Sequence, residues 1–308
     1  MKGRRLLRVL FVLCVTALST LPILSHIPTA RAVFSNNPIV RSGWTIPWNV
    51  SLDDGIQLYN VSYNGVLLLR DARLAGIIVN YYPFYNQACY FYDELRSSWI
   101  GPPNPAPYAL YYDNLTAGGF QIRGYYEVPG YDYQQIWRFY PDGHFLALLQ
   151  IGRGGCNEIH YYEPHWRLDF AIGSDVRNII LQYQTVGWVP IRQETILNDT
   201  GMRDSSHMFT SWEVAQGSRG VFFTPTDIQE TLWTPGTIIV VQDHANEIEK
   251  SHLPDQVDQD LSSYVNGESV FRKDIAVWYM SRHYDNPFLQ MNLAAPVLTG
   301  LVFYASGY

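Results

Sequence analysis

Short segments that alternate apolar and polar residues, each ended by a turn sequence, make up most of the chain. Residues 44–52, 55–63 and 65–74 are of this kind, and Asp-Asp-Gly and Asn-Gly separate them. Runs bounded in this way are typical of β-strands joined by tight turns. Comparable segments continue through the sequence, at 120–128, 133–140, 144–152, 165–173, 178–186, 220–227, 237–242 and 274–280.

The same pattern gives little sign of helices. No window of fifteen residues repeats its apolar positions with the 3.6-residue period of a helix. Aromatic residues, which strands favour, make up 15% of the chain. We therefore predict a mainly β protein, a single large antiparallel β-sandwich. Residues 101–110 predict a surface loop, and the polar residues 244–269 predict a long loop containing a helical turn.

The N-terminus departs from this pattern. Four basic residues among the first eight precede the apolar run VLFVLCVTALSTLPIL, and the small residues Ala-Arg-Ala follow at 30–32. This order predicts a signal peptide over residues 1–32 and a secreted, extracellular domain over residues 33–308. A retained membrane anchor is the alternative, but the run is short and interrupted by Ser, Thr and Pro. We expect no membrane association after cleavage.

Cleavage at that point makes the protein more acidic. It removes five of 21 basic residues and none of 28 acidic ones, which leaves 16 against 28 and a net charge of −12. Such a surface repels nucleic acid and attracts small cationic ligands. The charge would serve solubility equally well.

Cysteines and glycosylation sequons fit the same compartment. Cys14 leaves with the signal peptide, so Cys89 and Cys156 remain, and in an oxidising compartment they most simply form one disulfide. Four Asn-x-Ser/Thr sequons predict a glycoprotein. They begin at Asn49, Asn60, Asn114 and Asn198.

Five segments, in the same order along the chain, resemble the catalytic domain of the copper-dependent, topaquinone-containing amine oxidases. They cover roughly residues 43–287 and do not extend to that family's additional N-terminal domains. The segments are GIQLYNVSYNGVLLLRDARLAGIIVNYYP, GYDYQQIWRFYPDGHF, HYYEPHWRLDFAIG, VFFTPTDIQETLWTPGTIIVVQ and FRKDIAVWYMSRHYDNP.

The resemblance assigns catalytic roles to three residues. Tyr131 falls on the tyrosine that becomes the quinone, although Gly130 stands where the family has asparagine. Asp93 falls on the aspartate that acts as the proton-transfer base. Tyr81 falls on a tyrosine that hydrogen-bonds the quinone oxygen.

The resemblance also implies a copper site, with substitutions. His160 falls on the first histidine ligand, and Tyr162 stands where the second is expected. The third position carries Asp285, with His283 two residues earlier. Alternation along a strand puts His160 and Tyr162 on one face, and His165 on the other unless a bulge intervenes. A copper site would therefore draw on His160, Tyr162, His283 and Asp285.

The reaction implied is the oxidative deamination of a primary amine to an aldehyde, with release of ammonia and hydrogen peroxide. Its cofactors would be copper and topaquinone, and the quinone would serve as the electron sink while the protein supplies positioning and the base. The partner would be a small amine. Family members are dimers, but the long arms that hold those dimers together are not recognisable in this sequence, so a homodimer stays an open alternative.

Three hypotheses follow. The first is an active or altered amine oxidase. The second is a non-catalytic binding protein that kept the β-sandwich, in which Tyr131 only packs. The third is a metal-independent enzyme of a biosynthetic pathway that uses Asp93 as a proton-transfer base. His244, Glu247 and His252 lie close together in sequence but lack the spacing of a zinc motif.

Overall fold

The fold is described from a computed structural model of the chain. The described residues all belong to one compact unit, Arg31–Tyr308. The predicted signal peptide, Cys89, Cys156 and Gly130 lie outside them. The described residues are 38–50, 54–81, 91–93, 109–128, 131–152, 160–184, 186–198, 211–226, 236–245, 247, 261–281, 283–285 and 297–308.

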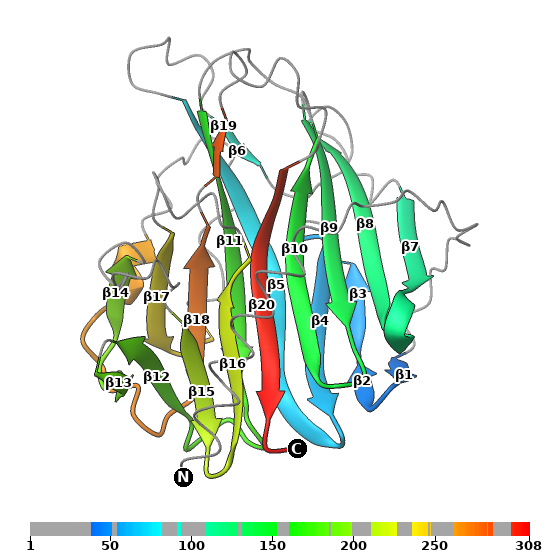
Figure 1. The fold of residues 1–308 in the computed structure, drawn as a ribbon. Coiled ribbons are helices and arrows are strands. Elements are labelled where there is room, and N and C mark those ends of the chain that lie inside the picture. The colour runs from blue at the N-terminus through cyan, green and yellow to red at the C-terminus, as the bar shows by residue number, and fades with distance from the viewer. Residues whose placement is uncertain are drawn as a thin grey trace. The chain divides into compact units, whose positions relative to one another are not determined.

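Two antiparallel sheets make up the structure, which confirms the predicted β-sandwich (Figure 1). Among the described residues, no helix has the length and hydrophobicity needed to cross a bilayer. Sheet A contains β1 (Ile39–Arg41), β2 (Trp44–Ile46), β3 (Trp48–Val50), β4 (Ile56–Tyr63), β5 (Val66–Tyr81), β6 (Phe91–Asp93), β11 (His160–Phe170), β14 (Thr195–Asn198), β17 (Thr237–Gln242), β18 (Ile275–Met280) and β19 (His283–Asp285).

Sheet B contains the remaining strands in the order β13-β12-β15-β16-β20-β10-β9-β8-β7. The main path of sheet A is β1-β2-β4-β5-β11-β18-β17-β14, with β3 beside β4, β6 beside β5 and β19 beside β11. The strands of sheet B are β7 (Ala109–Asn114), β8 (Phe120–Val128), β9 (Tyr131–Phe139), β10 (His144–Ile151), β12 (Ile179–Gln184), β13 (Gly187–Pro190), β15 (Trp212–Gln216), β16 (Arg219–Pro225) and β20 (Val297–Ser306). Two short 3-10 helices, η2 (Thr116–Gly118) and η4 (Leu261–Tyr264), complete the described elements.

The hydrophobic core lies between the two sheets. Tyr162, Trp166, Leu168 and Phe170 of β11, all an even number of residues apart, belong to this core, as the period of two in a strand requires. Rings from the two sheets meet directly, since Trp137 of β9 lies 5.4 Å from Trp166 and Phe170 lies 5.4 Å from Phe223 of β16. Burial of one such side chain contributes roughly 1.5–3 kcal/mol.

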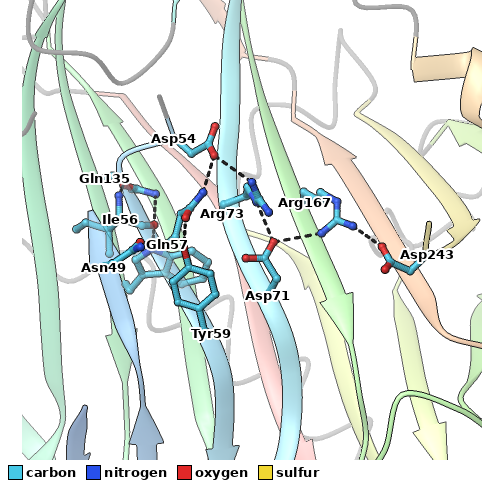
Figure 2. Close-up of polar contacts among 11 residues, drawn as sticks. Asn49, Asp54, Ile56, Gln57, Tyr59, Asp71, Arg73, Gln135, Arg167 and Asp243 are labelled. Carbon is cyan, nitrogen blue, oxygen red and sulfur yellow. Dashed lines mark hydrogen bonds and ion pairs between the residues drawn. The ribbon is translucent and has the colours of Figure 1, made fainter. Parts of the chain in front are cut away.

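A buried amide joins the two sheets through polar contacts. The side chain of Gln135 on β9 is fully buried, and its oxygen accepts a hydrogen bond from the Ile56 backbone N–H at 2.6 Å. Its nitrogen donates to the Ile56 carbonyl at 3.0 Å, and the Tyr126 hydroxyl donates to the Gln135 oxygen at 3.2 Å. Figure 2 shows Gln135 bonded to both backbone groups of Ile56. This amide therefore holds β9 at a defined position against β4.

The outer face of sheet A carries buried charges, whereas a strand's outer positions usually face water. Arg73 donates from Nε to Asp71 at 2.8 Å and lies 3.2 Å from Asp54 (Figure 2). Arg167, which is 2% exposed, donates to the same Asp71 oxygen at 3.1 Å and pairs with Asp243. A row of alternating charges thus connects β5, β11 and the end of β17. Each charged group has lost most of its hydration on burial, so its stability depends on the oppositely charged neighbours.

Candidate functional site

The predicted metal ligands come together where β5, β11 and β19 pair. β11 has β5 on one side and β19 on the other, both antiparallel. His160 lies opposite Tyr81 of β5 and opposite Asp285 of β19. Tyr162 lies opposite His283 of β19. Directly opposite residues in a sheet share a face, so these positions form one group.

That group lies on the face of sheet A that meets sheet B. Tyr162 belongs to the core between the sheets and is 1% exposed, as is His160. Their rings touch edge to face, with centroids 4.7 Å apart and planes at 78°. His283 is also buried, at 5% exposed. The expectation that His160 and Tyr162 share a face is confirmed by this ring contact.

The register arranges the four predicted ligands as a square of adjacent positions. His160 and Tyr162 form one side on β11, and Asp285 and His283 form the other on β19. Opposite residues on paired strands have Cβ atoms about 5 Å apart, and diagonal ones about 7–8 Å. Two imidazoles on such a diagonal are within reach of one ion. The side chain of Asp285 lies outside the described part of the structure, so its place is given by register alone.

The positions of two further predicted site residues belong to the same face of sheet A. Asp93 on β6 pairs with Ile77 of β5, and Ile77 is a core residue. Tyr81 is four residues beyond Ile77 on the same strand, so alternation assigns it the same face. The side chains of Asp93 and Tyr81 are outside the described residues. The register sets Tyr81 directly opposite His160, whereas Asp93 lies opposite Ile77, four residues along β5 from Tyr81.

Tyr131 begins β9 in the opposite sheet, and its position faces the same interior. Tyr133, two residues on, is a core residue, so alternation puts position 131 on the inner face. The contact between Trp137 and Trp166 supplies the alignment between the sheets. Tyr131 is six residues before Trp137, and His160 is six residues before Trp166. β9 and β11 both begin at the upper end of the view in Figure 1, which places the two positions at one end of the sandwich.

His165 lies on the other face of β11, as the sequence predicted. It pairs with Gly76 of β5, and the register with β5 shifts by one residue immediately after it. The extra residue of this bulge is on β5, so the alternation along β11 from His160 to Phe170 is preserved. His165 is therefore kept apart from the other histidines by the thickness of the sheet.

Asp169 is an unusual acidic group that no motif in the sequence pointed to. It lies opposite Asp71 on the outer face of sheet A and is 6% exposed. Burial, together with the nearby charges of Asp243 and Asp274, raises the pKa of Asp169 to about 8 against the opposing effect of Arg167. The sequence feature that could have indicated a buried acid is the Arg-x-Asp pair, Arg167 and Asp169, inside an otherwise apolar strand. An acid with this pKa is protonated at neutral pH.

A second polar group joins the 3-10 helix η4 and its following loop to sheet A. Glu194 accepts backbone N–H groups from Gln242 at 3.1 Å, from Asn266 at 2.8 Å and from Gly267 at 3.1 Å. His244 contacts Glu268 at 2.7 Å, and this hydrogen bond raises the pKa of His244. Ligand atoms of Glu194, His244 and Glu268 lie within 4.8 Å of one another.

The backbone N–H groups bonded to Glu194 indicate that this second polar group has a structural role. Both of its oxygens already accept N–H groups, an arrangement that fixes a loop and leaves little capacity for an ion. The hydrogen-bond partner of His244 is Glu268, and Glu194 lies within 4.8 Å of both. Glu247, which the sequence placed near His244, is a neighbour whose pKa is raised by burial. His252 lies outside the described residues.

Comparisons with known proteins agree with the fold. No protein-family profile matches the sequence, and no curated protein matches it. Among solved structures, a copper-containing benzylamine oxidase from Hansenula polymorpha matches with a TM-score of 0.64 and 11% identity, over 90% of this chain and 60% of the other. A lysyl oxidase from Pichia pastoris matches with a TM-score of 0.67 and 12% identity, over 93% and 56%.

An amine oxidase from Aspergillus nidulans gives the same result, with a TM-score of 0.65 and 15% identity over 93% of this chain and 55% of the other. The chain therefore has the fold of a copper amine oxidase β-sandwich. It spans between 55% and 60% of the length of these proteins. At such low identity the likeness establishes the fold, and the chemistry has to be argued from the residues present.

Proposed function

We propose that this protein is a secreted amine oxidase-like protein that binds a metal ion at the end of the sandwich and receives a primary amine there. The observation that carries the proposal is the register that sets His160, Tyr162, His283 and Asp285 in one square on the inner face. The shared fold of the amine oxidases supports it. Secretion is supported by the signal-like N-terminus.

The donor set suits copper. His160 and His283 offer two buried imidazoles, and Asp285 offers a carboxylate at the neighbouring position. Cu(II) accepts imidazole nitrogen readily and carboxylate oxygen less selectively, and Fe(II) and Zn(II) accept the same set. Copper bound here supplies, with dioxygen, the chemistry that converts a tyrosine ring into a quinone.

The chain's own residues would carry the remaining steps. Tyr131 is the ring to be converted, and the overall reaction turns a primary amine, water and dioxygen into an aldehyde, ammonia and hydrogen peroxide. Asp93 takes the proton from the carbon next to the amine nitrogen, and Tyr81 orients the ring through its hydroxyl. His160, at 1% exposed, is itself shielded from bulk water.

Tyr162 is the feature that favours altered chemistry. A phenol has an unperturbed pKa of about 10, so at neutral pH it is a poor ligand. The Tyr162 ring also packs edge to face on His160. The site therefore has one imidazole fewer on β11 than the amine oxidase pattern, and we infer weaker copper binding and slower conversion of Tyr131.

Metal analysis and peptide mass spectrometry test the proposal. We expect the secreted protein, incubated with copper and oxygen, to bind about one metal ion per chain through its paired imidazoles. His160→Ala and His283→Ala should each abolish binding, and His244→Ala, on a different group, should leave it intact. Conversion of Tyr131 would show as a gain of two oxygen atoms and a loss of two hydrogen atoms. Metal binding that survives both histidine variants would refute the proposal.

A binding function without redox chemistry is the second candidate, and the Tyr162 substitution favours it. Tyr162→His separates the two candidates, because it restores the missing imidazole at a position already beside His160. If this variant converts Tyr131 and the parent does not, the parent is a binding protein on an oxidase scaffold. Amine turnover that resists chelators but is lost in Asp93→Asn would instead support the metal-independent enzyme.

A further inference from the structure

Both sheets are open, so each has strands that are paired on one side only. Among the described strands these are β1, β3, β6, β14 and β19 in sheet A, and β7 and β13 in sheet B. An edge strand exposes a row of unpaired N–H and C=O groups that can pair with the edge of another molecule. Soluble β proteins therefore protect their edges with charges, prolines or coverings.

Three of these edges carry a glycosylation sequon. Asn49 lies in the middle of β3, Asn114 is the last residue of β7, and Asn198 is the last residue of β14. The β13 edge has no sequon, but it is only four residues long and ends at Pro190, which has no N–H to offer. β6 and β19 have no sequon either, and each is only three residues long. The sequons on β3 and β14 lie on opposite sides of sheet A, and the sequon on β7 and Pro190 on β13 lie on opposite sides of sheet B.

The contacts of the described asparagines are compatible with a sugar. The Asn114 side chain is exposed, and its oxygen accepts a hydrogen bond from the guanidinium of Arg41 on β1. The Asn49 oxygen accepts a hydrogen bond from the Tyr59 hydroxyl at 2.9 Å, visible in Figure 2. An N-linked glycan is attached through the amide nitrogen, so both of these contacts remain when the sugar is present.

The contact between Arg41 and Asn114 adds a second reason. Arg41 belongs to the edge strand of sheet A and Asn114 to the edge strand of sheet B. The Arg41 guanidinium also lies 3.3 Å from the Tyr112 hydroxyl of β7. One glycan on Asn114 therefore stands where edges of the two sheets meet, and it would shield both.

We propose that glycans on Asn49, Asn114 and Asn198 act as edge guards that keep a second copy of this chain from adding its strands to the sheets. The proposal depends on the proposed secretion and is independent of the amine chemistry. The fourth sequon provides an internal control, because Asn60 lies in β4, which is paired with β5 on one side and with β2 and β3 on the other.

The test replaces the hydroxyl residue of each sequon, because this keeps the asparagine and its hydrogen bonds. The triple variant Ser51→Ala, Thr116→Ala, Thr200→Ala lacks the three edge glycans, and Ser62→Ala lacks only the glycan on Asn60. All proteins are secreted from eukaryotic cells, their glycans are mapped by mass spectrometry, and their mass in solution is measured by light scattering over a range of concentrations.

The triple variant should gain mass with concentration, at least twofold over the parent, and Ser62→Ala should behave like the parent. If the triple variant is not secreted, enzymatic removal of glycans from the folded parent provides the same comparison. Edge asparagines that carry no sugar in the secreted parent would overturn the proposal. So would a deglycosylated protein whose mass equals that of the parent at every concentration.

Discussion

Gln135→Met should destabilise the protein more than the size of the change suggests. Methionine nearly preserves the volume of this buried side chain but removes its three hydrogen bonds. The Ile56 N–H then has lost its acceptor, at a cost of roughly 1–3 kcal/mol. Two further lost hydrogen bonds cost about 1 kcal/mol each, so we expect a total of about 3–5 kcal/mol. That is a large part of a typical stability of 5–15 kcal/mol.

The matched control is Gln134→Met on the same strand. Gln134 is 5% exposed, but its buried amide nitrogen has no hydrogen-bond partner among the described residues. Urea unfolding, followed by tryptophan fluorescence, measures the free energy of unfolding for both variants. The reasoning is refuted if Gln135→Met loses less than about 1 kcal/mol, or no more than Gln134→Met.

Three further predictions concern other buried groups. The pKa of Asp169 is about 8 in the folded protein, against an ordinary value of 3.8, so folding is coupled to proton binding between these pH values. The free energy of unfolding should therefore fall as pH rises through this window, by up to about 1.4 kcal/mol per pH unit. Asp169→Asn should flatten the curve of unfolding free energy against pH. Arg167→Met should cost about 3–5 kcal/mol in urea unfolding at pH 7, because it leaves Asp71 and Asp243 buried without their shared cation, and less at low pH. Gly300→Ala should prevent stable folding, because a Cβ there would lie 2.0 Å from a backbone oxygen of β10 and Gly300 has a φ of +148°. The loss of a cooperative thermal transition would show this. A normal thermal transition for this variant would contradict the β10–β20 pairing.

Local patterns were sufficient to predict the regular parts of the fold. The two strands on either side of the Pro-Asp-Gly turn are β9 and β10, with Phe139 opposite Phe145. Residues 65–74 were predicted as a short strand, whereas β5 continues to Tyr81. Its second half has no alternation because Ile77 and Ile78 are both buried, one on each face. A strand covered on both faces looks like any apolar segment in the sequence.

The missed strands are mostly at the edges. β7 overlaps the predicted loop at residues 101–110, and β13 and β14 were not singled out, because short edge strands carry little alternation. The helical turn expected in residues 244–269 is η4. These elements form because neighbouring strands present their hydrogen-bonding edges, which a local window does not contain.

The candidate site also has features that local patterns predict and features that they do not. That His160 and Tyr162 share a face follows from alternation, which any reader of the sequence can apply. That His283 lies opposite Tyr162 depends on the pairing of residues more than a hundred positions apart, and no local pattern encodes such a register. The charges of Asp71 and Arg167 were missed for a related reason: outer-face positions are expected to be solvated, and their burial is a property of the assembled sheet.

The position of β20 has a consequence for how the protein is made. This strand, the last one described, lies in the middle of sheet B, between β16 and β10. Until the ribosome has released residues 297–306, the two halves of that sheet have no strand to join them, and two future inner strands expose their edges. Pairing over such long sequence separations is slow and leaves partly folded chains prone to aggregation. A translation that stops before β20 should therefore yield an insoluble product, and chaperones should matter most until β20 has been synthesised.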